Sequence, residues 1–172
     1  MSNYFSLRVF LIGLILIVPA LRLHAQEKAA EKAGEHQPDH IMIMPGDIKW
    51  ADAPPGLPPG SQATVIEGDP RAAGLFTIRA KIPANWRVMP HSHPADEHIT
   101  VIEGSCYMGV GDKFDEKTAT KMTTGGFAVM KVGTHHYFFT NKECIIQVHG
   151  MGPWGITYVN PADDPRNKPN GQ

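Results

Sequence analysis

The chain has 172 residues, a formal net charge of -1 at pH 7 and 42% hydrophobic residues, which suits one globular domain with short tails. Its 16 lysines and arginines against 17 aspartates and glutamates leave no basic stripe that would neutralise phosphates, so a nucleic-acid partner is not expected. With 17 glycines, 15 prolines and no long helical periodicity beyond the first segment, the sequence favours many short strands and turns, and hence an all-β fold.

The first 25 residues have the pattern of a secretory signal peptide. Arg8 precedes an apolar run over residues 9–18, and residues 23–25 (Leu-His-Ala) offer a cleavage site before Gln26. An uncleaved anchor is the alternative, but the run is shorter than the ~20 apolar residues that a bilayer-spanning helix needs. We therefore expect an exported protein, periplasmic or secreted, with no stable membrane anchor after cleavage.

Composition divides the rest of the chain into three parts. Residues 26–47 form a short polar linker, residues 48–161 a single globular domain, and residues 162–172 a C-terminal tail. His36 and His40 lie in the linker, where isolated histidines are usually solvated rather than bound to metal.

Within the domain, short apolar segments alternate with turns that contain Gly, Pro, Asn or Asp. Strands at this spacing predict a closed barrel or jelly roll. The expected strands are residues 62–67, 75–82, 87–93, 98–103, 106–110, 127–131, 136–140, 143–149 and 155–159. The proline-rich segment 54–60 should instead wrap over the surface, because its prolines disfavour both helix and central strand.

A histidine-rich stretch carries the chemistry. His91 and His93 are two residues apart in a predicted strand, so their imidazoles point to the same face. The turn that contains Pro94 and Asp96 then brings Glu97 back beside them at the start of the next strand. Two nitrogens and one oxygen on one face suit a divalent transition metal. Asp96 is the alternative carboxylate, although its place within the turn suits it less.

The same stretch resembles the first motif of the cupin family. From His91 it has His-x-His, three further residues, Glu97, six more residues and Gly104. One departure is Asn85, which stands where the motif opens with a glycine. Asn tolerates the left-handed backbone conformation better than most residues, so the turn can survive.

The segment from Gly125 to His136 resembles the family's second motif. Gly125 and Gly133 match its glycines, and His136 matches its ligand histidine three residues after the turn glycine. Two departures concern turn details rather than ligands: Lys131 replaces the usual proline and Thr140 replaces the trailing asparagine.

The resemblance implies a single cupin jelly-roll barrel that binds one divalent transition-metal ion (Fe, Mn, Cu, Ni or Zn) through His91, His93, Glu97 and His136. It also implies a small organic molecule as ligand, and a homodimer. Cupins include enzymes of oxygenation, decarboxylation and isomerisation as well as binders without turnover. We expect a metal-dependent enzyme, with oxygenase chemistry favoured, and hold a non-catalytic periplasmic binding protein as the alternative. No residue is assigned as a catalytic acid or base.

Strand parity predicts the surroundings of the cluster. His98 and His135 each neighbour a candidate ligand in sequence and should point to the opposite face. Phe138 and Met89, each two residues from a ligand, should point inward and line the pocket.

Five further residues each allow two interpretations. Trp86 and Trp154 either cover one end of the pocket or belong to the core. His149 either lines the barrel mouth or is structural. In an oxidising compartment Cys106 and Cys144 could form a disulfide, but each lies in an apolar strand segment, so we expect two small buried side chains.

Overall fold

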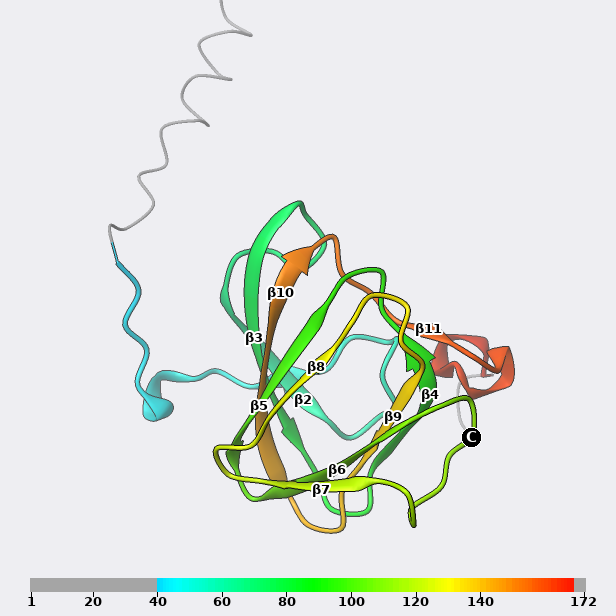
Figure 1. Ribbon diagram of the computed structural model, residues 1–172. Coiled ribbons are helices and arrows are strands. Elements are labelled where there is room, and N and C mark those ends of the chain that lie inside the picture. Colours follow the sequence, from blue (N-terminus) through cyan, green and yellow to red (C-terminus); the bar gives the residue numbers. More distant parts are fainter. Residues whose placement is uncertain (1–39, 169–172) are drawn as a thin grey trace, which may run out of the picture. The chain divides into compact units, whose positions relative to one another are not determined.

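The computed structural model describes residues 40–168, which form eleven strands and three short 3-10 helices (Figure 1). The expected signal peptide and most of the polar linker lie outside these residues. No helix in this part of the chain is long and apolar enough to span a membrane. The strands are β1 (Ala51–Asp52), β2 (Gln62–Glu67), β3 (Gly74–Ile82), β4 (Arg87–Ser92), β5 (Glu97–Glu103), β6 (Ser105–Val110), β7 (Thr120–Thr123), β8 (Phe127–Met130), β9 (His136–Phe139), β10 (Cys144–Gly152) and β11 (Thr157–Tyr158). The 3-10 helices are η1 (Pro45–Asp47), η2 (Pro161–Asp163) and η3 (Pro165–Asn167).

The strands form two antiparallel sheets, which confirms the all-β, jelly-roll expectation. One sheet has the order β1-β2-β3-β10-β5-β8 and the other β11-β4-β9-β6-β7. Every expected strand is present within a few residues of its predicted bounds, and β2 has the predicted bounds. Two strands were not expected: β1, which has two residues, and β7, in which Met122 alone is buried.

The expectation of a closed barrel is wrong. Each sheet keeps two edges, β1 and β8 in one and β11 and β7 in the other, and no ladder within residues 40–168 joins an edge to the opposite sheet. Edge strands β1 and β11 have two residues each, too few to continue the pairing. The chain instead changes sheet at tight turns such as Gly104 between β5 and β6, so the domain is a two-sheet sandwich.

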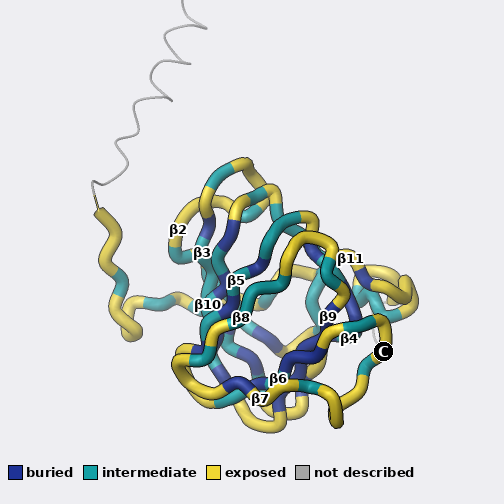
Figure 2. The backbone as a smooth tube through the Cα atoms, viewed as in Figure 1, coloured by how far each residue is buried: buried dark blue, intermediate teal, exposed yellow. Residues whose placement is uncertain are grey.

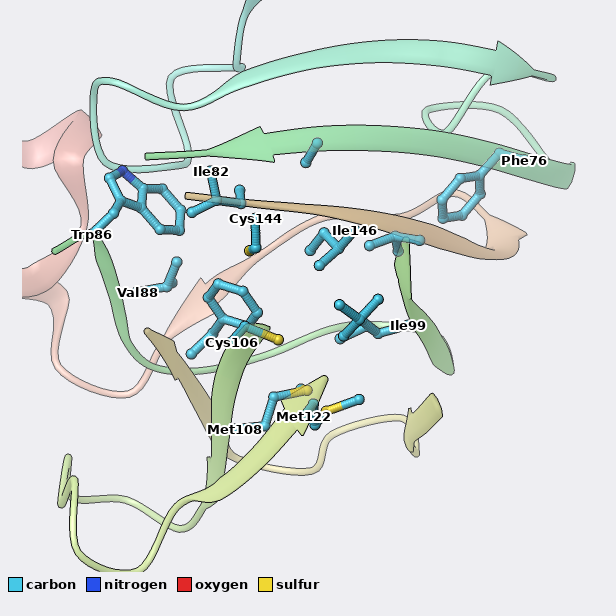
Figure 3. Packing of buried hydrophobic residues seen from close by; sticks show 14 of the residues in the cluster. Phe76, Ile82, Trp86, Val88, Ile99, Cys106, Met108, Met122, Cys144 and Ile146 are labelled. Carbon is cyan, nitrogen blue, oxygen red and sulfur yellow. The ribbon is translucent and has the colours of Figure 1, made fainter. Parts of the chain in front are cut away.

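The core fills the space between the two sheets. Figure 2 shows buried stretches along strands of both sheets and exposed stretches on the turns that connect them. In β10, buried residues alternate with half-buried ones from Cys144 to Gly150, as expected for a strand with one face on a core. Figure 3 shows side chains of the six-stranded sheet, such as Ile82 and Ile146, above Met108 of the five-stranded sheet.

Strand β4 departs from simple alternation. Its pairing with β9 shifts between Val88 and His91, which marks a β-bulge or irregularity. Because of this shift Val88, three residues before His91, lines the internal cavity together with His91. The prediction that Met89 lines the cavity is therefore wrong, since it assumed an unbroken two-residue period.

Candidate metal centre

Three of the four predicted ligands lie in three strands that meet at one place between the sheets, and the fourth lies just after one of these strands. His91 lies in β4, His93 directly follows it, Glu97 opens β5 and His136 opens β9. His91 and His136 are direct partners in the β4–β9 ladder. All four side chains are buried; even the most accessible residue, Glu97, is only 6% exposed.

Two turns fix the backbone around the cluster. Asp96, in the turn between β4 and β5, accepts hydrogen bonds from Lys131 Nζ and from the Val132 amide, each at 2.8 Å. The Gly133 amide donates to the His93 carbonyl at 3.0 Å. The turn of the first motif is thereby tied to that of the second. Asp96, the alternative carboxylate, is engaged in this contact, whereas Glu97 faces the imidazoles.

The donor atoms converge. One ring nitrogen each of His91, His93 and His136 lies within 4.8 Å of the others, a spacing at which the three histidines could hold one metal ion. Glu97 Oε2 lies 3.4 Å from His93 Nε2 and 3.2 Å from His136 Nε2. His93 Nε2 and Glu97 Oε2 are buried and have no well-aligned hydrogen-bond partner. Buried polar atoms without partners are costly, and a shared cation would satisfy both.

Each imidazole is oriented by its second nitrogen. All three Nδ1 atoms lie within hydrogen-bond distance of a backbone carbonyl, an arrangement that keeps the proton on Nδ1 and leaves the Nε2 lone pair free for a metal. The pairs are His91 with Met89 at 2.8 Å, His93 with Gly155 at 2.6 Å and His136 with Thr134 at 3.0 Å.

The electrostatics of the cluster suit a cation. Burial, reinforced by His136 and His93, lowers the pKa of His91 to about 3, so this ring stays neutral. Burial alone would raise the pKa of Glu97, but the imidazoles of His136 and His93, 3.2 and 3.4 Å from Oε2, outweigh it and the pKa is lowered, so the carboxylate stays charged. Burial acts to lower the pKa of His93, but the adjacent Glu97 carboxylate and its negative charge prevail and raise it.

Aromatic rings brace two of the histidines. Trp154 stacks on His93 with ring centroids 4.5 Å apart, and its other neighbour is Phe76 at 5.5 Å. Tyr158 lies 6.0 Å from the His91 ring and donates its hydroxyl to the Gly56 carbonyl at 2.9 Å. The sequence marked Trp154 only as a cover or core residue and did not single out Tyr158. No local motif links either residue to a ligand far away in the chain.

The cluster forms part of the wall of a cavity of about 650 Å³ between the sheets. Phe138 lines it, as strand parity predicted, and Trp86 and Trp154, for which two interpretations were open, line it as well. Most of the remaining lining is apolar, including Ile78, Ala80, Ile82, Val88, Ile99, Met108, Ile146 and Val148. Among the described residues, the titratable side chains of the lining other than the four candidate ligands are exposed: Lys49, Asp52, Arg71 and Arg166.

The remaining histidines of the domain lie apart from the cluster. His98 points away from the cavity, as predicted, and stacks on His149, its direct partner in the β5–β10 ladder, with centroids 4.9 Å apart. His149 is therefore not at the cavity mouth. His135 is exposed, and its Nδ1 contacts Asp112 Oδ1 at 2.6 Å.

The sheets and the buried histidine cluster define an all-β protein with a candidate metal centre inside the sandwich. The sequence matches no protein-family model and no curated protein. Solved structures do match. The polyketide cyclase RemF from Streptomyces resistomycificus is 20% identical with a TM-score of 0.61, over 73% of this chain and 89% of the other.

Two further structures are similar. One is a putative acetylacetone dioxygenase from Methylibium petroleiphilum, 16% identical with a TM-score of 0.56, over 75% of this chain and 87% of the other. The second is an RmlC-like cupin from Shewanella frigidimarina, 14% identical with a TM-score of 0.51, over 67% and 92%. The chain therefore has the cupin fold that its two motifs predicted.

Proposed function

We propose that this protein is a metal-dependent enzyme that acts on a small, largely apolar organic molecule, with oxygenation as the favoured reaction. One observation carries the proposal: three buried imidazoles, each with its Nδ1 at a backbone carbonyl, meet the Glu97 carboxylate on the wall of an apolar cavity. Such a cluster is costly to bury without a ligand, and a cavity gives it access to one.

The donor set fits a divalent transition metal. Three imidazole nitrogens and one carboxylate suit Fe, Mn, Cu, Ni or Zn, and they leave one or two positions open in an octahedral arrangement. When bound, such a metal supplies a Lewis acid and, if it is redox-active, a site for dioxygen chemistry. The protein's own part is to hold His91, His93 and His136 in one tautomer and to keep Glu97 ionised.

The cavity favours a small apolar substrate with a polar end. Its volume of about 650 Å³ lies in the range of ordinary small-molecule pockets. The buried polar groups of its lining are gathered at the metal cluster, so a substrate's oxygen atoms would turn toward that cluster and its carbon skeleton toward Phe138 and Ile146.

The placement of titratable groups favours oxygenation over isomerisation. Proton transfer at carbon needs an acid or base beside the substrate. Within residues 40–168, the titratable lining groups apart from the ligands are exposed, on Lys49, Asp52, Arg71 and Arg166. Two similar structures are named as a polyketide cyclase and a putative acetylacetone dioxygenase, and both names denote enzymes of small organic molecules.

We also propose that the protein is exported, on the evidence of residues 1–25, and that two copies pair.

The alternative function is a non-catalytic periplasmic binding protein, and one experiment separates it from the enzyme. Protein loaded with each metal in turn is mixed with β-diketones, o-diphenols and aromatic polyketides while dissolved oxygen and product masses are followed. We expect oxygen consumption that disappears in His136→Ala and Glu97→Ala variants. Binding of these molecules without turnover for any metal would favour the binding protein.

A further inference from the structure

Two cysteine side chains meet in the core although they belong to different sheets. Cys106 lies in β6 of the five-stranded sheet and Cys144 opens β10 of the six-stranded sheet. Both are free thiols, 0% and 1% exposed respectively, and both belong to the same buried core cluster, close enough to shift each other's pKa. Figure 3 shows both among the packed apolar side chains. The expectation of two small buried side chains is thus confirmed, but they are also neighbours.

The fold explains why these two residues approach each other. Gly104 alone separates β5 from β6, so the chain passes between sheets over one residue. A Cβ at Gly104 would lie 2.7 Å from the Glu143 carbonyl oxygen and 3.3 Å from Cys144 Cβ. This close approach draws the start of β6 toward the start of β10. Disulfides need Cα atoms about 4.4–6.8 Å apart, which facing sheets reach only at such a corner.

The two thiols are not equivalent. Both thiols are buried, but Cys144 directly follows an exposed turn, residues 141–143, whereas the chain neighbours of Cys106, Ser105 and Tyr107, are half-buried. The contact with Cys106 holds the pKa of Cys144 below its ordinary value. The same contact, together with burial, raises the pKa of Cys106. Thiolate character and access therefore both favour Cys144 as the first thiol to react.

We propose that Cys106 and Cys144 form an oxidisable dithiol that closes into a disulfide and links β6 to β10 across the sandwich. The oxidant would be a low-molecular-weight disulfide such as oxidised glutathione. The Cys144 thiolate attacks one sulfur and releases the first glutathione thiolate, and Cys106 then attacks the Cys144 sulfur and releases the second. The two protons lost by the protein end on the two glutathione thiols.

The link would be separate from the metal centre. Neither cysteine belongs to the lining of the cavity, and neither is within ligand distance of the histidine cluster. The chain has 2 cysteines, so within one chain this is the one disulfide that can form. Its effect would be to fix the two sheets at the corner where β5 gives way to β6.

Intact mass tests the proposal directly. The full chain is incubated with oxidised glutathione, denatured, alkylated with iodoacetamide and weighed. We expect a monomer about 2 Da lighter than the reduced chain, without alkylation, that yields one cross-linked peptide pair holding Cys106 and Cys144. Alkylation of both thiols after exposure to the oxidant, or cross-linked dimers in place of the monomer, would overturn the proposal.

Single variants and thermal unfolding give independent readouts. Cys106→Ser should accumulate one glutathione on Cys144, whereas Cys144→Ser should leave Cys106 unmodified; the reverse pattern would contradict the order of attack.

The oxidised wild-type chain should unfold at a temperature roughly 10 °C above the reduced chain. An equal or lower unfolding temperature would contradict a link that braces the sheets.

Discussion

Trp154 lies flat against His93, with ring centroids 4.5 Å apart and planes 20° from parallel. The next residue in the chain, Gly155, places its carbonyl oxygen 2.6 Å from His93 Nδ1. One short segment after β10 therefore holds this imidazole by its face and by its edge. His93 is the candidate ligand outside the strands, so it depends most on such support.

Loss of the indole should weaken metal binding. In Trp154→Ala the His93 ring gains rotational freedom, and we expect the metal affinity to fall about tenfold or more, the usual effect of removing a residue that orients a ligand. Trp154→Phe keeps a stacking ring and should stay near wild type. Competition against a chromophoric chelator measures both. Equal affinities for the alanine and wild-type proteins would show that the stack does not position His93.

Glu97→Gln should lower metal affinity more strongly, by roughly a hundredfold, because it replaces a buried anionic donor by a neutral amide. The matched control is Glu103→Gln, at the exposed end of the same strand and outside the cavity lining. Circular dichroism and the same chelator competition should show two folded proteins of which one has lost affinity. If Glu97→Gln and Glu103→Gln bind alike, Glu97 is not a ligand.

Metal affinity should fall in mild acid through His93. Burial alone lowers the pKa of His93, but the adjacent, negatively charged Glu97 carboxylate outweighs it and the pKa is raised. A proton on Nε2 blocks the metal, so affinity should drop about tenfold per pH unit once the pH passes below that pKa. His91, with a pKa lowered to about 3, adds nothing in this range.

The Glu97→Gln variant provides the internal control for this pH dependence. Without the carboxylate the proton on His93 is less stable, so the loss of affinity should begin at a lower pH than in the wild type. Titrations between about pH 8 and pH 5 test this. A common onset in both proteins would show that Glu97 does not set the protonation of His93.

Variants of Asn85 test the backbone conformation of the turn that opens the first motif. It has φ +58°, in the left-handed region, between the end of β3 and the start of β4. Asn85→Gly should keep the stability of the wild type, whereas Asn85→Ala should lower the free energy of unfolding by about 1 kcal/mol, since alanine resists this conformation. Urea denaturation gives both values. An alanine variant as stable as the glycine variant would contradict the strain argument.

Much of the site could be predicted because its ligands follow local rules. The spacing of His91 and His93, the reversal before Glu97 and the glycine turn before His136 each need only strand and turn geometry. The left-handed Asn85 was predicted from the glycine that it replaces, and the structure confirms it.

The two residues that depart from the second motif, Lys131 and Thr140, make contacts that local sequence patterns do not predict. Lys131 pairs with Asp96 in the first motif's turn at 2.8 Å. Thr140 Oγ1 donates to the Pro83 carbonyl at 2.6 Å and accepts from the Trp86 amide at 3.2 Å, so it ties the end of β9 to the turn that holds Asn85. Both contacts join segments far apart in sequence.

Three other features could not be predicted either, because they also depend on contacts between segments far apart in the sequence. The irregular pairing of β4 replaces Met89 by Val88 in the cavity, and it arises from the fit of β4 against β9 rather than from the sequence of β4 alone. The open edges of the sheets depend on how far β1 and β11 extend, which the turn signals do not reveal. The contact of Cys106 with Cys144 likewise exists only where two sheets converge.

The central claim is that the buried histidine cluster binds one transition-metal ion. Elemental analysis of the purified protein beside the His91→Ala/His93→Ala double variant tests it most directly, with His98→Ala/His149→Ala as a control that removes two histidines on the opposite face of the sheet. We predict nearly one metal ion per chain in the wild type and the control, and none in the cluster variant. Metal absent from the wild type, or retained by a folded cluster variant, would contradict this account.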